Sequence, residues 1–257
     1  QFRPAVPAGL MDPARFAAAC EKALTGGRAR QGIGTLGERS LHAALKEYFR
    51  GDGDETEVPV GRFVADIRGP GGITEVQTRD FNRLRGKLEH FLPLGPVTVV
   101  YPIPALKWLV WLGEDGSATP RRKSPKQAQA CEVLPELSKI KPWLGHENLL
   151  LCLVFLEVEE YRLQNGWGNN GKRGSTRYER LPLALLGELW VQSLSDYQQL
   201  LPAGLPEEFT AKEFAKAGKL SPKKASFALG TLREAGTIRQ VGKRGRAFLY
   251  GRNTERG

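Results

Sequence analysis

Cysteine, histidine and methionine are scarce in this 257-residue sequence, which contains three, three and one of them. Cys20, Cys131 and Cys152 are widely separated and odd in number, which argues against a disulfide framework and against a thiolate zinc site. Such sparse thiols are typical of reduced cytosol, so we expect a cytoplasmic protein. The three histidines have no metal-ligand spacing, and we expect ordinary structural roles for them: His42, His90 and His146.

Long apolar runs and negative charge are lacking as well. The run NLLLCLVFLEVEEY (148–161) is too short for a membrane span and ends in acids. The sequence starts without a secretory signal pattern, and we expect no membrane partner. The 38 Lys and Arg outnumber the 28 Asp and Glu, and the resulting net charge of +10 favours polyanionic partners.

Two helices are expected near the start of the chain. In MDPARFAAACEKAL (11–24), Asp12 is a candidate N-cap and Pro13 occupies the first helical position. In LGERSLHAALKEYF (36–49), apolar residues recur at the i, i+3, i+4, i+7, i+8 spacing of a buried helix face. Glu38 lies on that same face, where an acid is unusual.

The middle of the sequence predicts a mixed α/β core over 31–200, preceded by a helical extension over 1–30. Its order of strands, helices and turn-rich loops supports this class. The expected elements are strands at 58–67, 72–78, 96–103 and 148–163, a helix over 80–93 capped by Asp80, a strand with a hairpin loop over 107–125, a loop over 164–177 and a helical connector over 181–201.

Two acids interrupt strands that otherwise look buried, in VADIRGPGGITEVQT (64–78). The Pro-Gly-Gly connection predicts antiparallel neighbours, which brings Asp66 and Glu75 together. Two carboxylates in a partly buried place repel each other unless a proton or a cation neutralises them. Carboxylate oxygens suit Mg²⁺ or Mn²⁺, which also bind phosphate oxygens and promote phosphodiester hydrolysis. The structural alternative is that these acids pair with surface arginines such as Arg68 or Arg79.

The order of a helix acid, a strand Asp, a Glu-x-Gln on the next strand and a following helix resembles the PD-(D/E)XK nuclease superfamily. The likeness covers roughly 34–103 and implies a restriction-endonuclease-like mixed central sheet flanked by helices. It implies that Asp66 and Glu75 are catalytic ligands of Mg²⁺ or Mn²⁺. Glu38 would be a further ligand, or else a first-turn acid favoured by the helix dipole. Gln77 stands where most members have Lys, and because Gln is neither a base nor a cation, it would only orient the attacking water.

Several cations are candidates for holding nucleic acid. Trp108 and Trp111, which lie between two of these groups, are expected in the core rather than as a base-stacking platform. The candidates are Arg79 after the acidic motif, and Arg121, Arg122 and Lys123 in PRRKSPK (120–126), whose alternative is a merely solvated hairpin tip. Arg79, Arg83 and Lys87 are also candidates for stabilising the charge of the transition state.

The C-terminal segment over 203–257 predicts a small winged helix. Thr210 and Glu213 match a capping box, and Ser221 with Pro222 begins a second helix that stops at Gly236. An alternating run with a basic turn, TIRQVGKRGRAFLYG (237–251), then predicts a hairpin. From 201 to 257 there are twelve Lys and Arg against five Glu, an excess of seven, which favours DNA. The expected contacts are Lys223 and Lys224 on the helix and Lys243, Arg244 and Arg246 on the wing, with packing or dimerisation as the alternative role.

These features together predict a divalent-metal-dependent DNA endonuclease acting on double-stranded or branched DNA. A homodimer is compatible with this function, since one active site cuts one strand of the DNA. The first alternative is a catalytically inactive, nuclease-like DNA-binding regulator, which Gln77 favours. The second is an adaptor whose winged helix binds protein.

Overall fold

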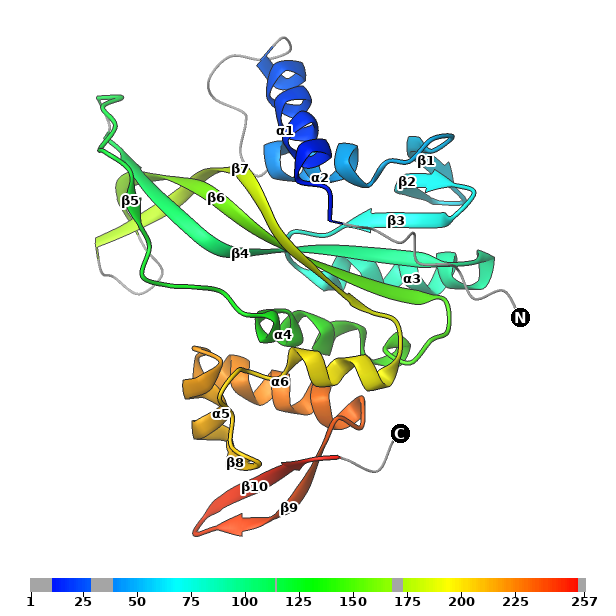
Figure 1. The fold of residues 1–257 in the computed structure, drawn as a ribbon, viewed down its shortest axis with the longest axis vertical. Coiled ribbons are helices and arrows are strands. Elements are labelled where there is room, and N and C mark those ends of the chain that lie inside the picture. Colours follow the sequence, from blue (N-terminus) through cyan, green and yellow to red (C-terminus); the bar gives the residue numbers. More distant parts are fainter. Residues whose placement is uncertain (1–10, 29–38, 114, 168–172, 254–257) are drawn as a thin grey trace.

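A computed structural model describes residues 11–28, 39–113, 115–167 and 173–253. It contains one large sheet, one small sheet and helices around both (Figure 1). The elements are α1 (Pro13–Arg28), α2 (Arg39–Phe49), β1 (Glu55–Val60), β2 (Phe63–Gly69), β3 (Gly72–Val76), α3 (Leu84–Phe91), β4 (Val97–Leu112), β5 (Arg122–Lys123), α4 (Leu134–Leu137), β6 (Leu149–Trp167), β7 (Arg173–Val191), β8 (Glu208–Thr210), α5 (Ala211–Ala217), α6 (Pro222–Glu234), β9 (Ile238–Arg244) and β10 (Ala247–Arg252).

The large sheet has the strand order β1-β2-β3-β4-β6-β7, and β5 pairs with β4. Strands β3, β4 and β6 run parallel to one another, and the outer pairs are antiparallel. The expected mixed α/β class, with a mixed sheet flanked by helices, is therefore confirmed. Gly72 begins β3 with a φ of 114°, and a Cβ there would lie 2.3 Å from the Pro96 carbonyl oxygen. Only glycine allows this close start of β3 beside β4.

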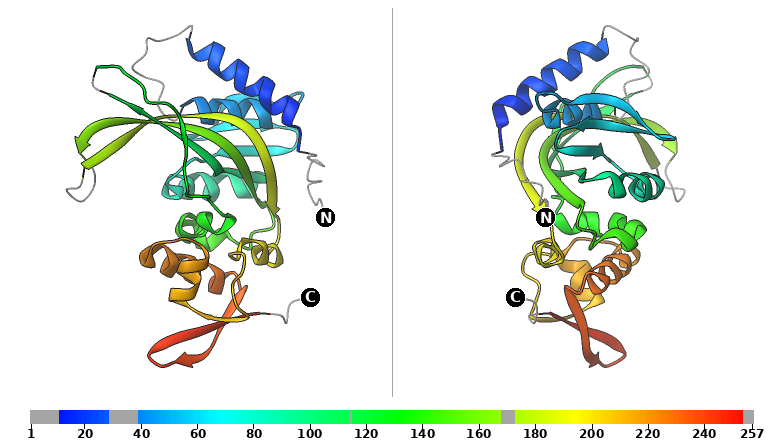
Figure 2. Two further views of the ribbon diagram at one scale, coloured as in Figure 1. Left: turned by 60° about the vertical axis from the view of Figure 1, so that its left-hand side comes forward. Right: turned by 90° about the vertical axis from the view of Figure 1, so that its right-hand side faces the viewer.

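Helices cover both faces of this sheet (Figures 1 and 2). One buried cluster joins α1 and α2 to the sheet through side chains such as Leu45, Val76 and Val154. The other joins α3 and α4 to the opposite face through side chains such as Leu88 and Ile73. The apolar faces predicted for the helices are confirmed, because Leu41, Ala44, Leu45, Tyr48, Phe81, Leu84, Leu88 and Phe91 are all buried. The cap predicted for α1 is also present, since the Arg15 N–H donates to Asp12 Oδ1 at 2.9 Å.

Three predicted elements are wrong. The helical connector over 181–201 is mostly strand, because β7 pairs along β6 from Arg173 to Val191 and a 3₁₀ segment, η5 (Leu194–Leu200), follows. The predicted loop over 164–177 is partly strand, because β6 continues to Trp167 and β7 begins at Arg173. The single strand over 58–67 is instead the β1–β2 hairpin.

Two smaller corrections concern the ends of elements. The strands expected over 96–103 and within 107–125 are one continuous strand, β4, bent by a bulge between Pro104 and Leu106. Asp80 does not cap the helix that follows it. Its backbone is left-handed, with a φ of 54°, and its side chain instead accepts hydrogen bonds from Asn82 and Lys139.

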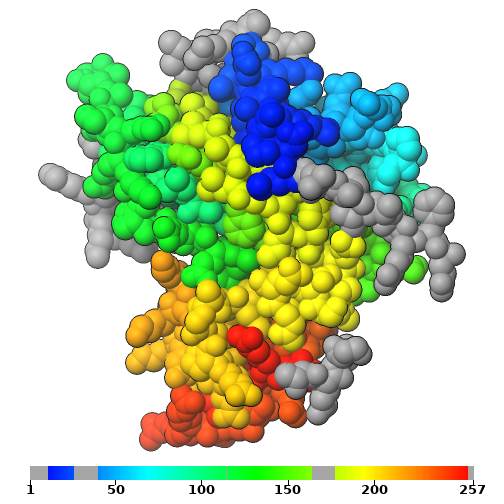
Figure 3. Space-filling view, viewed as in Figure 1, coloured from blue at the N-terminus to red at the C-terminus, as the bar shows by residue number. Residues whose placement is uncertain are grey.

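The C-terminal segment contains the predicted two helices and basic hairpin. Thr210 and Glu213 form the capping box, and Ser221 caps α6. A small sheet of order β8-β10-β9 backs the helices. Helix α6 packs against α4 of the core, and Thr231 Oγ1 donates to the Leu134 carbonyl at 3.0 Å. The buried cluster beneath α3 and α4 continues into α6 through Leu229 and Leu232, so the two parts share one core. On the surface, the orange and red C-terminal part packs directly against the green and yellow parts of the chain (Figure 3).

Membrane crossing by a helix requires a long apolar segment. None of the helices within the described ranges has the length and apolarity for it.

Candidate active site

The two acids lie where the ladder between β2 and β3 stops. The last paired residues are Ile67 and Thr74. Beyond them, the side chains of Asp66 and Glu75 bridge β2 and β3. Asp66 Oδ2 accepts from the Val76 N–H at 2.8 Å, and Glu75 Oε1 accepts from the Asp66 N–H at 3.2 Å. Each side chain therefore replaces a ladder hydrogen bond of the other strand. The predicted neighbourhood of Asp66 and Glu75 is present.

Asp66 turns toward α2. His42 Nε2 lies 3.3 Å from Asp66 Oδ2, and Lys46 Nζ lies 3.9 Å from Asp66 Oδ1. Burial would raise the pKa of the Asp66 carboxyl, but the contacts led by His42 together outweigh it and leave that pKa below its ordinary value. Asp66 is therefore ionised at neutral pH.

Glu75 turns toward α3, on the other face of the sheet. Its side chain is almost fully buried, and Lys87 Nζ donates to Glu75 Oε2 at 2.6 Å. Burial first, and then the negative charge of Asp66, raise the pKa of the Glu75 carboxyl to about 7 despite the Lys87 ammonium. The two acids are thus electrostatically coupled although they contact helices on opposite faces. The structural alternative had expected these acids to pair with arginines such as Arg68 or Arg79. Asp66 instead contacts His42 and Lys46, and Glu75 contacts Lys87.

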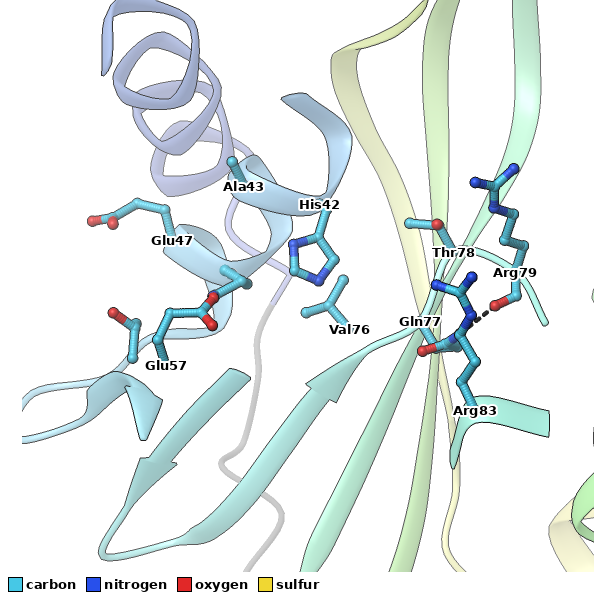
Figure 4. A pocket seen from close by; sticks show the side chains of 11 residues that line it. His42, Ala43, Glu47, Glu57, Val76, Gln77, Thr78, Arg79 and Arg83 are labelled. Atoms are coloured by element: carbon cyan, nitrogen blue, oxygen red, sulfur yellow. Dashed lines mark hydrogen bonds and ion pairs between the residues drawn. The ribbon is translucent and has the colours of Figure 1, made fainter. Parts of the chain in front are cut away.

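An open cleft of about 820 Å³ lies beside this pair, between α2 with β1 on one side and the end of β3 on the other (Figure 4). His42, Lys46 and Glu57 line one wall, and Arg79 and Arg83 line the other. Cations therefore face the cleft from both sides. Two acids, Glu47 and Glu57, also line it, so the lining is polar and carries charge of both signs.

His42 lies at the candidate site, which the sequence did not predict. It was expected to be structural, but it contacts Asp66 and lines the cleft. Its place in α2, on the side that faces β3, was the available signal. Glu57 was also missed: it lines the cleft, contacts Lys46, and has a φ of 55° inside a strand. A left-handed backbone at a non-glycine residue is costly.

Gln77 does not point at the acids. Its side-chain amide donates to the backbone carbonyls of Arg79 and Asp80, the latter at 3.1 Å, which holds it in the turn after β3. Lys87 instead supplies the cation nearest to Glu75. Glu38, the expected helix acid, lies outside the described residues.

The segment 120–126, which includes β5, has its predicted cations on the surface. Arg122 and Lys123 form β5 and are exposed. Arg121 lies over the Trp108 ring at 4.5 Å, and Trp111 has Arg162 at 6.0 Å. The prediction that Trp108 and Trp111 are core residues is therefore wrong: both are only half-buried and stack under arginines.

The C-terminal cations are also exposed. Lys223 and Lys224 lie in the first turn of α6, and Lys243, Arg244 and Arg246 lie at the hairpin of β9 and β10. The β9–β10 hairpin lies at the opposite end of the molecule from α2 and β1 (Figure 1). The structure thus places the predicted site residues in three groups: at the cleft, around β5 and in the C-terminal segment.

Comparisons with known proteins relate the large sheet to one family. A family model described as "Domain of unknown function (DUF8091)" matches residues 39–192, which contain α2 and all strands of the large sheet. A Treponema pallidum (strain Nichols) protein described as "Uncharacterized protein" is 34% identical over 225 residues, covering 85% of this chain and 86% of that protein. No solved structure matches.

Proposed function

The chain belongs to the DUF8091 family, and we propose that it is a divalent-metal-dependent DNA endonuclease of the restriction-endonuclease-like fold. The observation that carries this proposal is the pair of coupled carboxylates, Asp66 and Glu75, at the point where two strands part beside a cation-lined cleft. Such a pair fits Mg²⁺ or Mn²⁺, because Mg²⁺ is commonly held by one or two carboxylates and several waters. No group of three or more acidic, histidine or cysteine ligands gathers among the described residues, so the proposal rests on two.

In this proposal Asp66 and Glu75 would hold the ion in the gap between β2 and β3, where each carboxylate accepts a backbone N–H of the other strand although the side chains turn to opposite faces. When bound, it polarises a phosphoryl group and lowers the pKa of a coordinated water. Lys46 and Lys87 would balance the charge of the two acids from opposite sides. Arg83, with its side chain largely exposed in the cleft wall, would contact a substrate phosphate and neutralise charge that develops there.

The C-terminal module would hold the duplex. Its order of 3₁₀ segment, strand, two helices and hairpin, with the small sheet ordered β8-β10-β9, supports a winged helix. The exposed lysines at the start of α6 and the cations of the hairpin would contact the DNA backbone. The proposal places the protein in the cytoplasm, as its buried free cysteines favour. It also includes a homodimer for cutting both strands.

Metal-dependent cleavage of supercoiled plasmid tests this function. We expect wild-type protein to nick DNA with Mg²⁺ or Mn²⁺ but not with EDTA, and Asp66→Asn and Glu75→Gln each to lower the rate by about 10³-fold, because each removes a ligand charge. Asp52→Asn, in an exposed turn, is the matched control and should cleave like wild type. Equal cleavage by all four proteins, or none by wild type with either ion, would refute the proposal.

A second candidate function is a catalytically inactive, nuclease-like DNA-binding regulator. The observation that favours it is the position of Gln77, whose amide is held by backbone carbonyls in the turn. In that case Lys87 is a structural counterion for Glu75. Duplex binding in a gel-shift assay, together with no cleavage in the plasmid assay, would identify this function.

A further inference from the structure

The large sheet projects beyond the candidate active site. Strand β3 ends at Val76, whose partner on β4 is Val100, but β4 continues to Leu112 with β6 and β7 beside it. These strands arch away from the helices, with β5 along their edge (Figure 2). The projection begins on the side of the sheet where Asp66 and Glu75 lie, so a strand of nucleic acid leaving the cleft has this surface next to it.

A buried acid gathers four cations on this projection. Glu160 on β6 is fully buried, and one carboxylate neutralises one unit of charge. The cations come from three strands: Lys107 Nζ lies 3.6 Å from its oxygens, Arg162 Nη2 2.7 Å, Arg177 Nε 3.4 Å and Arg180 Nη2 3.1 Å. Counted against Glu160 alone, the four cations carry more charge than its carboxylate. Burial, opposed by Glu160 and aided by the neighbouring arginines, leaves the pKa of Lys107 below its ordinary value, which reflects this crowding.

The cluster has a buried layer and an accessible layer. Arg180 is only 7% exposed, and its Nε is buried without a hydrogen-bond acceptor in the part of the chain that the structure describes. The side chains of Arg162 and Arg177 are 31% and 40% exposed. A buried donor without an acceptor costs free energy unless something else supplies one. Phosphate oxygens are strong acceptors that suit guanidinium groups.

The rim of the cluster has a composition that suits nucleic acid. Trp111 on β4 is the partner of Arg162 on β6, and the Arg162 guanidinium lies 6.0 Å from the centre of its ring. Arg122 on β5, whose partner on β4 is Leu109, is exposed at the edge of the same face. Cations interleaved with half-buried aromatic rings are typical of surfaces that bind polynucleotide backbones.

We propose that the cluster of Lys107, Arg162, Arg177 and Arg180 around Glu160 is a second nucleic-acid contact, which takes phosphates of the strand that extends from the cleft. This inference rests on the proposed function for its ligand, but it makes a separate claim about where that ligand lies. Glu160 keeps like charges together in the absence of nucleic acid, so the site is preformed.

The test measures duplex binding by fluorescence anisotropy at several salt concentrations, in the Asp66→Asn background so that no DNA is cut. For the double variant Arg162→Gln/Arg177→Gln we expect affinity to fall about tenfold near 0.1 M salt and the slope of log affinity against log salt to become shallower by about 1 to 2, since each lost phosphate contact releases one counterion fewer. The matched control, Arg15→Gln/Arg62→Gln, removes the same charge from α1 and the β1–β2 turn and should leave both quantities near wild type.

Two further variants separate charge from folding. Arg162→Lys/Arg177→Lys keeps the charge and should retain the salt slope. Arg122→Gln/Lys123→Gln changes only exposed residues of β5 and should make the slope shallower by about 1. An unchanged salt slope in Arg162→Gln/Arg177→Gln, or an equal loss of slope in Arg162→Lys/Arg177→Lys, overturns the inference. Wild-type cleavage that depends on Asp66 would survive that result, so the two proposals fail separately.

Discussion

Glu160→Gln is expected to lower the free energy of unfolding by about 3 to 5 kcal/mol. The carboxylate is fully buried and contacts four cations, so the neutral amide would leave Lys107 and three arginines facing one another. Breaking a buried ion pair from one side is far more costly than replacing both partners. Urea unfolding monitored by tryptophan fluorescence measures the change, with the slope of the transition checked for constancy.

The matched control is Glu47→Gln, which removes the acid of the exposed Lys22–Glu47 pair at 2.5 Å. Exposed ion pairs contribute about 0 to 1 kcal/mol, so this variant should change stability little. If Glu160→Gln changes stability no more than Glu47→Gln does, the cluster is not held by its central acid.

The pH dependence of the stability difference between wild type and Glu160→Gln is a second test of this residue. Burial would raise the pKa of the Glu160 carboxyl, but Lys107 and the arginines outweigh it and lower that pKa to about 2. A carboxyl with a lowered folded-state pKa contributes stability above its unfolded pKa, and that contribution is lost as pH falls through the folded pKa. The stability gap between wild type and Glu160→Gln should therefore shrink between about pH 4.5 and pH 2.

Leu137→Ala is expected to cost about 2 to 5 kcal/mol and to destabilise both parts of the chain together. Leu137 lies in α4, is fully buried, and belongs to the cluster that continues into α6. Because the core and the C-terminal module share this cluster, a cavity there should loosen both. Native-state hydrogen exchange checks this: amides of β6 and of α6 should accelerate by similar factors.

Leu186→Ala, at a side chain 45% exposed on β7, is the control and should cost well under 1 kcal/mol. Faster exchange confined to α6, with β6 unchanged, would show that the C-terminal module opens independently. The winged-helix proposal would then describe a tethered domain instead of one fixed against the core.

Local patterns were sufficient for the helices and the C-terminal module. The apolar spacing in 36–49 predicted the buried face of α2, and the Thr210–Glu213 pair predicted a cap that forms within three residues. Such features depend on neighbours in sequence, which are present before the fold is. That Asp66 and Glu75 are neighbours was also predictable, because a tight turn joins their strands.

Features that depend on distant partners were not predictable. LPLALLGELWV (181–191) is rich in helix formers, yet it is strand because β6 pairs along its length, and tertiary pairing overrides propensity. The cluster around Glu160 draws on Lys107 and Arg180, which only the sheet brings together. The direction of Gln77 depends on carbonyls in the turn beyond it, which periodicity does not specify.

Equilibrium binding of Mn²⁺, followed by the EPR signal of the free ion, tests the central claim most directly. Wild type and the Asp52→Asn control should each remove about one equivalent of Mn²⁺ from the free signal, since two carboxylates and waters suffice to hold such an ion. Asp66→Asn and Glu75→Gln should each lower the affinity by at least about tenfold. Undiminished binding in both variants, or no binding by wild type, would contradict a metal site at these two acids.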